Sequence, residues 1–360
     1  MSKLKAGVIG LGMGWNHLKG YIEHPDVEVV AVADRRADRR DRAKAEYGNQ
    51  ISRIYSEGLE MIQKEKLDIV SVAVPNNQHI ELTLAGLESG ANVLCEKPMA
   101  MNAAEAQKMY DTAKRLGLKL GIDFSYRFNP KSRAMKQLVE AGKLGEIYYA
   151  RTTWLRRSGV PGLAAANFNT GSTGGMGSWF FDKKQSGGGP LIDLGVHRLD
   201  LALWLMGYPE PSCVLGSTYS KIAPGMCKAQ GLDYTVEDLA CAMIKFKNGA
   251  TIELQAGWAG NIKEKELQQT RLMGTKGGLY QYNFNEGYGY DVDYYTCENN
   301  LFLDTKLHDP VPEAPNPFAS FADSVRDNTP FLVKPEDGVT VMKLLDAIYQ
   351  SAATGKPVVF

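Results

Sequence analysis

The sequence has no long hydrophobic run and no excess of charge of either sign. Among its 360 residues, no stretch approaches the roughly 18 apolar residues that a bilayer-spanning helix needs. Its 41 basic residues equal its 41 acidic residues, so the formal net charge is zero. A neutral chain has no long-range field to attract nucleic acid or an anionic membrane. We therefore expect neither of these partners.

Cysteine is scarce and irregularly placed. The five cysteines are scattered and never occur as CxxC pairs, which argues against a disulfide framework or a structural zinc site. The first residues, MSKLKAGVIG, lack the apolar core and cleavage site of a secretory signal. Both features are typical of a protein from the reducing cytoplasm, and we expect a cytoplasmic location.

The first third of the sequence alternates short apolar runs with longer amphipathic stretches. The apolar runs are continuous, as expected when helices cover both faces of a sheet. Repeated βαβ units predict a doubly wound parallel sheet, a Rossmann domain of the α/β class, over residues 1–125. Strands are expected at 5–9, 27–33, 68–74, 91–95 and 119–123, and helices at 16–23, 38–47, 58–64, 78–89 and 103–116.

The pattern changes after residue 123. A helix is expected to begin at Pro130, and residues 159–189 form a polar, glycine-rich stretch that predicts a long loop. Alternating strand-like stretches predict an α+β domain with a mostly antiparallel sheet over residues 126–360. These stretches cover 147–155, 214–221, 238–245, 251–259 and 269–273.

A glycine-dense turn, VIGLGMGWNH, separates the first expected strand from the first helix. Backbone N–H groups and the positive end of a helix dipole converge at such a turn, which suits the pyrophosphate of a dinucleotide. Gly10 would form the tight turn, Gly12 would let the backbone approach the phosphates, and Gly14 would let the helix close on the strand. We expect coenzyme contacts from these glycines and from Met13 and Trp15.

Asp34 ends the second expected strand, 24 residues after Gly10. An acidic side chain at this position can accept hydrogen bonds from the adenosine ribose, and a simple helix cap is the alternative role. Arg35 and Arg36 could neutralise the additional phosphate of NADP, whereas Asp34 would repel it. This charge argument favours NAD, with Asp34 and Arg35 as coenzyme contacts, and leaves NADP as the alternative.

Three residues carry chemistry at the ends of expected elements. Lys97 follows the fifth strand in CEKP, where a ligand of an open α/β sheet would lie, and could stabilise an alkoxide or pass a proton. Asp193 and His197, in GGGPLIDLGVH, are four apart and would share a helix face. Such a pair suits a general base and its orienting partner. A structural hydrogen bond in a buried helix is one alternative, and a metal site that includes Asp200 is another.

No metal is expected, because the sequence has no HExxH motif and no evident third ligand beside the Asp193–His197 pair. The glycine turn, Glu96-Lys97-Pro98 and GGGPLIDLGVH, in this order, resemble the Gfo/Idh/MocA family of oxidoreductases. The likeness extends over nearly the whole chain and includes VPNNQH at 74–79 and YRFNP at 126–130.

The resemblance implies a Rossmann domain followed by a domain with a large open sheet, which commonly mediates dimers or tetramers. We therefore expect a homo-oligomer. It also implies that Lys97, Asp193 and His197 form a catalytic triad, in which His197 takes a proton, Asp193 fixes the imidazole and Lys97 stabilises the oxyanion. The implied contacts to the nicotinamide half come from Val74, Pro75, Asn76, His79, Glu96 and Lys97.

The expected substrate is a sugar, an inositol or a related polyol, whose secondary hydroxyl carbon exchanges a hydride with NAD. Tryptophan faces suit the C–H faces of a sugar ring, and Arg or Lys donors suit its hydroxyls; packing is the alternative role for each such residue. The expected substrate contacts are Lys97, Arg127, Trp154, Arg156, Trp179, Lys183, Asp193 and His197.

Two other functions are compatible with this fold. A redox-assisted glycosidase would use the same triad with a retained NAD that is regenerated in each turnover. A sensor of dinucleotides or sugars would need no catalytic groups, and the presence of Lys97, Asp193 and His197 therefore disfavours it.

Overall fold

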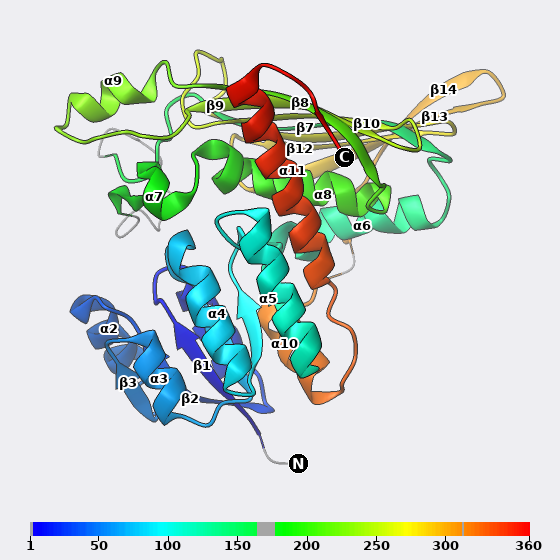
Figure 1. Ribbon diagram of the computed structural model, residues 1–360. Coiled ribbons are helices and arrows are strands. Elements are labelled where there is room, and N and C mark those ends of the chain that lie inside the picture. Colours follow the sequence, from blue (N-terminus) through cyan, green and yellow to red (C-terminus); the bar gives the residue numbers. More distant parts are fainter. Residues whose placement is uncertain (1–2, 164–176, 312) are drawn as a thin grey trace. The chain divides into compact units, whose positions relative to one another are not determined.

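The computed structural model describes residues 3–163, 177–311 and 313–360. The chain divides into two compact units. Unit 1 contains residues 1–124 and 315–342, and unit 2 contains residues 125–314 and 343–360 (Figure 1).

Unit 1 is built on a sheet of six parallel strands in the order β3-β2-β1-β4-β5-β6. This is the order of a dinucleotide-binding Rossmann sheet, and it confirms the predicted doubly wound fold. Strand β3 was not predicted, because it is only three residues long and not buried. The strands are β1 (Leu4–Ile9), β2 (Val27–Ala33), β3 (Arg53–Tyr55), β4 (Ile69–Val72), β5 (Asn92–Cys95) and β6 (Leu120–Ile122).

Helices follow the strands of unit 1 at close to the expected positions, because the amphipathic stretches between the apolar runs pack on the sheet. A short 3-10 turn, η1 (Asn76–Gln78), precedes the fourth helix. The helices are α1 (Gly14–Ile22), α2 (Ala37–Tyr47), α3 (Gly58–Lys64), α4 (His79–Glu88) and α5 (Ala103–Leu116).

A late segment of the chain returns to unit 1, whereas the sequence placed all of 126–360 in the second domain. Helix α10 (Pro317–Arg326) buries Phe318 and Phe321 in the same core cluster as Leu18 of α1. Its last residue, Arg326, forms a 2.7 Å ion pair with Asp26. This packing could not be predicted from local sequence patterns, because the partners of α10 lie about 300 residues earlier in the chain.

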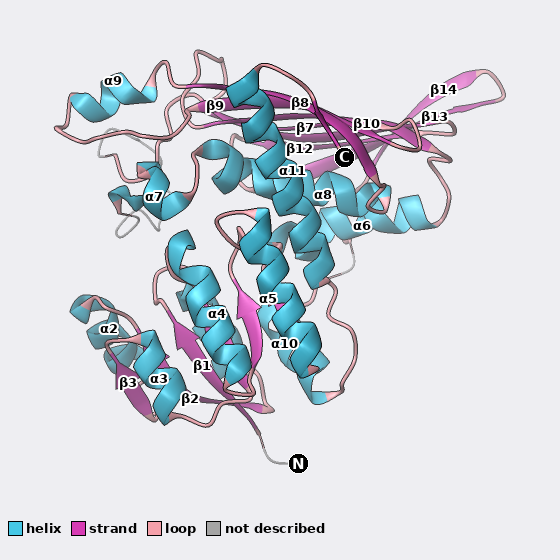
Figure 2. Ribbon diagram, in the orientation of Figure 1, coloured by secondary structure: helices cyan, strands magenta, loops and turns pink. Residues whose placement is uncertain are grey.

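In the described part of unit 2, nine strands form one sheet in the order β14-β13-β12-β11-β7-β10-β9-β8-β15 (Figure 2). Only β7 and β10 pair in parallel, so the predicted mostly antiparallel sheet is confirmed. The strands are β7 (Ile147–Arg156), β8 (Pro211–Tyr219), β9 (Leu239–Phe246), β10 (Thr251–Gly257), β11 (Glu266–Gly274), β12 (Gly278–Phe284), β13 (Gly289–Glu298), β14 (Leu301–Lys306) and β15 (Val358–Val359).

Helices cover one face of this sheet. Alternate residues of β10, such as Ile252 and Leu254, are buried against them, whereas Leu215 of β8 and Met243 of β9 are exposed on the other face. The helices and helical turns are η2 (Ser125–Phe128), α6 (Pro130–Glu140), η3 (Ser178–Phe181), α7 (Lys183–Ser186), η4 (Leu191–Gly195), α8 (Val196–Met206), α9 (Ala223–Lys228) and α11 (Pro335–Thr354), inside which the division between the units falls.

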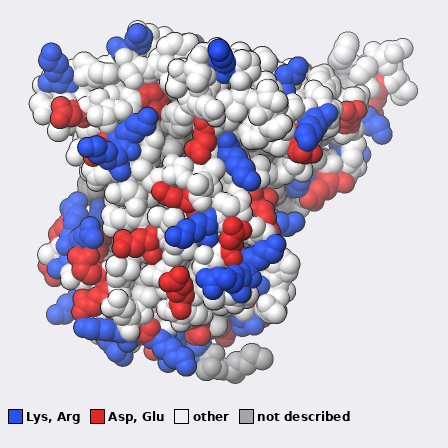
Figure 3. Space-filling view, viewed as in Figure 1, with Lys and Arg blue, Asp and Glu red and all other residues white. Residues whose placement is uncertain are grey.

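The expected long loop at 159–189 is in part helical, because η3 and α7 occupy its second half. Residues 164–176 of this stretch lie outside the described residues. Among the helices that the structure describes, none combines the length and the apolar character needed to cross a membrane. On the face drawn in Figure 3, basic and acidic side chains are interspersed, in agreement with the balanced composition.

A substitution of Phe321 tests whether α10 packs in the core of unit 1. We expect Phe321→Ala to lower the free energy of unfolding of this unit by about 3–5 kcal/mol, since a fully buried aromatic ring would leave a cavity. The matched control is Phe302→Ala, because the Phe302 side chain is 89% exposed. Denaturant titration of both variants makes the comparison, and equal stabilities would contradict the assignment of α10.

Candidate active site

The turn after β1 fits the backbone of a dinucleotide. Gly10 has φ +88°, and a Cβ at this position would lie 2.2 Å from the carbonyl oxygen of Ala73. Gly14 lets α1 approach the sheet, because its Cβ would meet the side chains of Ala73 and Val8 at 3.1 Å. Among the described residues, no side chain caps the N-terminus of α1. The N–H groups of Trp15 and Asn16 bond to the carbonyl oxygens of Gly12 and Met13, and the helix end keeps a partial positive charge that suits an anion such as pyrophosphate.

Asp34 lies at the carboxyl end of β2 and is held there by three donors. Its carboxylate accepts hydrogen bonds from the N–H of Leu11 at 2.7 Å and the N–H of Arg36 at 2.8 Å. The guanidinium of Arg39 donates a third at 3.2 Å. Arg36 is the N-cap residue of α2, so the bond to its N–H lies just before the helix and does not make Asp34 the cap, while the bond to Leu11 fixes the carboxylate beside the glycine turn.

Arg35 and Arg36, the residues that left NADP open, are both paired with acids. Arg35 contacts Glu57 at 3.1 Å, and Arg36 contacts Asp38 at 2.7 Å. These exposed pairs neutralise much of the positive charge that the additional phosphate of NADP would need. The arrangement suits NAD better than NADP.

Met13 and Trp15, the other predicted contacts in the turn, differ in their surroundings. Met13 is 46% exposed. The ring of Trp15 packs under the guanidinium of Arg42 at 3.7 Å and lies 5.6 Å from the ring of Tyr47. Both partners of Trp15 belong to α2, so this side chain holds α1 against α2.

The predicted VPNNQH segment forms the loop after β4, and His79 fastens it. Its Nδ1 lies 2.8 Å from the carbonyl oxygen of Pro98, and its Nε2 lies 2.9 Å from that of Val74. The side chain is fully buried, and burial lowers the pKa of His79. We therefore correct the predicted direct coenzyme contact: His79 ties the loop after β4 to the loop after β5. Pro75 and the buried Asn76 begin the turn η1 between these anchors.

Glu96 and Lys97 follow β5, and the Lys97–Pro98 peptide is cis. The side chain of Glu96 folds back and accepts a hydrogen bond from the N–H of Lys97 at 3.1 Å. Its other oxygen lies 3.1 Å from Nε2 of His17 on α1. Lys97 itself is half-buried at the carboxyl edge of the sheet. Glu96 thus shapes the backbone that carries Lys97.

A buried cluster continues below Glu96 and was not found from the sequence. His17, Glu96 and Asp123 offer ligand atoms that all lie within 4.8 Å of one another. Ser71 of β4 joins His17 to Tyr21, with contacts of 3.1 Å and 2.9 Å. His17, Glu96 and Asp123 have the ligand atoms to hold a metal ion. Because His17 and Glu96 already share a hydrogen bond, a hydrogen-bonded network that shares protons is the simpler interpretation.

In unit 2, the glycine run before Pro190 is held by Glu237. Its carboxylate accepts hydrogen bonds from the N–H of Gly189 at 2.9 Å and of Leu191 at 3.0 Å, and from the hydroxyl of Tyr349 at 2.9 Å. Gly189 is required, because a Cβ there would lie 2.2 Å from the carbonyl oxygen of Glu237. The start of the DLGVH segment is therefore fixed by backbone contacts.

The predicted α-helix around Asp193 and His197 is in fact two different helices. Asp193 lies in η4, a single turn of π-helix, and His197 lies in the first turn of α8. The wider π-helical turn changes the angle between residues four apart, and such turns are frequent at functional sites. The carboxylate of Asp193 accepts a 3.0 Å hydrogen bond from the indole of Trp258, which follows β10.

Aromatic rings surround His197. Its ring centroid lies 5.3 Å from that of Tyr126 and 5.7 Å from that of Trp154. The indole of Trp154 donates a 2.6 Å hydrogen bond to Glu266 of β11, which also lies 3.2 Å from the guanidinium of Arg156. Trp154 therefore lies beside His197, and Arg156 shares Glu266 with it; their contact with a substrate stays a prediction.

Arg127 was predicted to contact the substrate, and the structure contradicts this. Its guanidinium donates to both carboxylate oxygens of Asp200, at 3.0 Å and 2.6 Å, and to the hydroxyl of Tyr208 at 2.7 Å. Arg127 and Asp200 are both fully buried. Arg127 and Asp200 neutralise each other in the core. The carboxylate of Asp200 is therefore occupied by Arg127, and we reject the alternative that it is a metal ligand.

Trp179 and Lys183 lie in different places. Trp179 stacks on Phe180 at 4.0 Å between centroids, and Phe180 meets Trp258 edge-on at 6.4 Å. Trp179 thus belongs to the aromatic group near Asp193. Lys183 is exposed and lines a separate hollow of about 310 Å³ with Tyr234 and Thr235.

Several residues of the unit 2 site were missed, although the sequence carried a signal for some of them. Glu266 and Gln268 are polar residues at buried positions of the alternating strand β11. A buried charge within a strand pattern indicates a specific partner. Arg198 gave no signal: it is fully buried, and its guanidinium contacts Tyr290 at 3.1 Å and lies over the rings of Tyr126 and Trp154.

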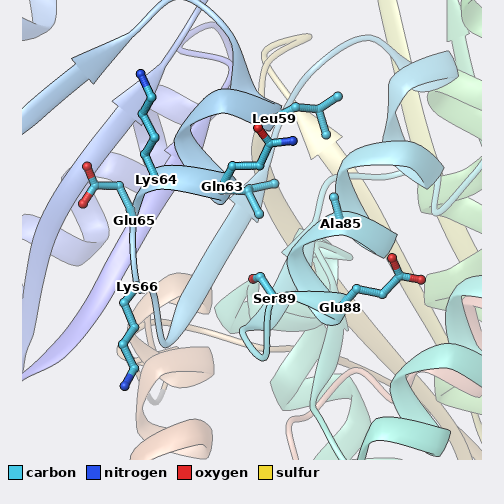
Figure 4. A pocket seen from close by; sticks show the side chains of 9 residues that line it. Leu59, Gln63, Lys64, Glu65, Lys66, Ala85, Glu88 and Ser89 are labelled. Atoms are coloured by element: carbon cyan, nitrogen blue, oxygen red, sulfur yellow. The ribbon is translucent and has the colours of Figure 1, made fainter.

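A larger hollow of about 530 Å³ lies on unit 1 between α3 and α4 (Figure 4). Its lining includes Gln63, Lys66, Glu88 and Ser89. Lys66 precedes β4 and Ser89 precedes β5, so the hollow lies at the amino ends of these strands. Ligands of open α/β sheets bind at the carboxyl ends, where Gly10, Asp34 and Glu96 are found. This hollow is not the coenzyme site.

Comparisons with known proteins agree with the fold of both parts. Residues 4–124 match the family model for the Gfo/Idh/MocA oxidoreductase family with an NAD-binding Rossmann fold, and residues 132–280 match that for the Gfo/Idh/MocA C-terminal domain. Among solved structures, a levoglucosan dehydrogenase in complex with NADH has a TM-score of 0.83 at 24% identity, with 99% of each chain covered.

Two curated relatives are dehydrogenases. The D-glucoside 3-dehydrogenase of Escherichia coli (strain K12) is 33% identical over 98% of this chain and 97% of its own length. The myo-inositol 2-dehydrogenase of Thermotoga maritima is 27% identical over 79% of this chain and 84% of its own. With both parts matched and such identity along nearly its whole length, the chain belongs to the Gfo/Idh/MocA family of NAD-binding oxidoreductases.

Proposed function

We propose that this NAD-dependent dehydrogenase oxidises a secondary ring hydroxyl of a glucoside or a closely related sugar. The observation that carries the proposal is the group around His197, a half-buried histidine that packs on the buried rings of Trp154 and Tyr126, with the half-exposed ring of Tyr288 next to Trp154. Apolar ring faces bind the C–H faces of a pyranose, and an imidazole can accept the proton of its hydroxyl. The 33% identity to a D-glucoside 3-dehydrogenase supports this choice of sugar.

In the proposed mechanism, NAD, when bound, accepts a hydride from the hydroxyl-bearing carbon. His197 removes the hydroxyl proton, and Asp193, held by the indole of Trp258, orients the imidazole. Lys97 stabilises the negative charge that develops on the oxygen. The proposal requires that Lys97 and His197 act on the same substrate oxygen.

Substrate contacts follow from the same arrangement. Trp154 is only 4% exposed and would support the site from behind, whereas the half-exposed ring of Tyr288, 6.0 Å from it, would offer a face to the sugar. Arg156 offers guanidinium donors next to the hydroxyl of Tyr288, 3.1 Å away. Tyr288 is half-exposed and was not among the predicted residues. Trp179 would add a further aromatic ring to the site, because it stacks on Phe180, which contacts Trp258. Lys183 would contact only a larger substrate, because it lines a different hollow.

The outer face of the unit 2 sheet supports the proposed homo-oligomer. Leu215 and Met243 are opposite each other on β8 and β9 and are 50% and 45% exposed. Next to Met243 in the strand register come Glu253 of β10 and Arg151 of β7, an exposed ion pair, so the apolar surface is confined to the Leu215–Met243 pair. An exposed apolar pair of this kind would suit a contact with a second copy. The cytoplasmic location stays a prediction from the sequence.

Lys97 and His197 can be tested by separate substitutions. We expect Lys97→Met and His197→Ala to lower kcat by a factor of about 10²–10⁴, since each removes proton transfer or charge stabilisation from the reaction. The Kd for NAD should change little. The matched controls are Lys184→Met and His308→Ala, whose side chains are exposed. Stopped-flow measurement of NADH formation and fluorescence titration with NADH separate the two effects; normal turnover in both variants would refute the triad.

The coenzyme preference depends on Asp34. We expect Asp34→Ala to raise the KM for NAD by a factor of about 10–100, because a charge-assisted hydrogen bond contributes roughly 1.5–3 kcal/mol. The same change should improve the use of NADP, since the repelling charge is gone. Asp41→Ala, at an exposed position of α2, serves as the control, because Asp41 is not one of the acids paired with Arg35 or Arg36. An unchanged ratio of NAD to NADP use in Asp34→Ala would contradict the assignment.

The redox-assisted glycosidase, which could use the same residues, is distinguished by its products. A dehydrogenase forms one NADH for each glucoside consumed and leaves the glycosidic bond intact. We expect this result when a methyl glucoside and excess NAD are followed by absorbance and chromatography. Release of methanol without net NADH would instead establish the glycosidase.

A further inference from the structure

The buried cluster beneath Glu96 has a composition that a structural role does not explain. It contains two carboxyl groups, Glu96 and Asp123, whose exposed fractions are 7% each. Oxygen atoms of both lie within 4.8 Å of Nε2 of His17, which itself is fully buried. Two carboxylates this close repel each other strongly in a medium of low dielectric constant, so full ionisation of both is costly.

One atom of the cluster lacks a partner. Oδ2 of Asp123 lies 3.9 Å from Nε2 of His17, whereas Oδ1 is buried and, among the described residues, has no hydrogen-bond partner. A buried carboxylate oxygen without a donor is strongly destabilised. A protonated Asp123 reduces this cost, because the neutral acid needs less solvation and can donate a hydrogen bond toward Glu96.

The surrounding groups are uncharged or cationic. Burial raises the pKa of Tyr21 and of Cys95, so both are neutral near pH 7. His79, whose pKa is lowered by burial, faces Glu96 from α4, and Lys97 lies on the same loop as Glu96. Ser71 and the ring of Phe318, 4.2 Å from that of His17, close the remaining sides.

The two acids differ in their ionisation. Burial would raise the pKa of Glu96, but the hydrogen bond from His17 and the nearby charges lower it overall. For Asp123, burial and the negative charge of Glu96 raise the pKa to about 7. Glu96 is therefore the permanent anion, and Asp123 is the group that gains or loses a proton in the physiological range.

The cluster also lies in the half of the sheet that is expected to bind the nicotinamide end of the coenzyme. The glycine turn and Asp34 assign β1 and β2 to the adenosine half, and Glu96 and Asp123 follow β5 and β6 in the other half. The nicotinamide ring is a cation in NAD and neutral in NADH. A charge that changes beneath this half therefore interacts differently with the two forms.

We propose that His17, Glu96 and Asp123 form a proton-binding site that couples protonation of unit 1 to the redox state of the bound coenzyme. Protonation of Asp123 weakens the binding of NAD, because it removes a negative charge near the cationic nicotinamide ring. It has little effect on the binding of NADH, whose ring is neutral. By reciprocity, NAD binding releases this proton, and loss of the proton strengthens NAD binding. The proposal rests on binding of the coenzyme and not on the proposed sugar substrate. Asp123 and His17 act through Glu96 as positioning residues.

The test compares wild-type protein with Asp123→Asn, which keeps the shape of the side chain but cannot ionise. Kd values for NAD and NADH are measured by calorimetry between pH 5.5 and 8.5 in buffers of different ionisation enthalpy, which also gives the protons released. As the pH rises through about 7, we expect the wild-type Kd for NAD to fall by a factor of about three to ten relative to that for NADH. In Asp123→Asn this ratio should be independent of pH.

Asp111→Asn, an exposed acid on α5, is the matched control and should behave as the wild type. If Asp123→Asn does not fold, infrared difference spectra of the wild type provide the same test. The carboxylic-acid band of a buried acid should be present at pH 6, disappear near pH 7, and be lost at pH 6.5 when NAD is added.

Three results would overturn the proposal. One is the same dependence of the NAD-to-NADH ratio on pH in Asp123→Asn and in the wild type. Another is a wild-type spectrum without a titrating carboxylic acid. The third is a stoichiometric metal ion in the purified protein that Asp123→Asn loses. A protein that shows the expected proton linkage but no activity on glucosides would refute only the proposed substrate.

Discussion

The close approach of the turn after β1 to the end of β4 is the constraint on which the coenzyme half of this protein depends. A Cβ at Gly10 would lie 2.2 Å from the carbonyl oxygen of Ala73, so the backbone can pass there only as glycine. This approach leaves the N-terminus of α1 uncapped at the carboxyl edge of the sheet. It also presses α1 onto the strands, so that His17, one turn later, meets Ser71 and Glu96. The anion site and the buried cluster therefore share one origin.

Local patterns were enough to predict the framework, because they report on burial and turn geometry. Continuous apolar runs gave the parallel strands, and the glycine spacing gave the coenzyme turn. Contacts between residues far apart in sequence were not predictable in this way. Arg127 and Asp200 are separated by 73 residues, and Arg127 was expected to contact the substrate because guanidinium donors suit sugar hydroxyls. The return of α10 to unit 1 escaped for the same reason.

The candidate catalytic pair shows how far spacing can be trusted. A separation of four residues correctly placed Asp193 and His197 on adjoining turns, but it implied a regular α-helix. The π-helical turn at η4 and the hydrogen bond from Trp258 depend on β10, 65 residues away, and have no local signature. By contrast, Glu266 could have been identified as a site residue, since an acid at an inward position of an alternating strand must have a buried partner.

The buried acids Asp200 and Asp123 differ in how completely they are paired. Arg127 and Asp200 form a closed pair in which both carboxylate oxygens accept hydrogen bonds and Tyr208 completes the group, so the pair has little to exchange with a ligand. Among the residues that the structure describes, Asp123 has one carboxylate oxygen without a donor, and an unsatisfied buried polar group costs about 1–3 kcal/mol. The complete pairing of Asp200 shows that this fold can provide partners for a buried acid. The incomplete pairing of Asp123 is therefore better explained by the proton that it exchanges than by imperfect packing.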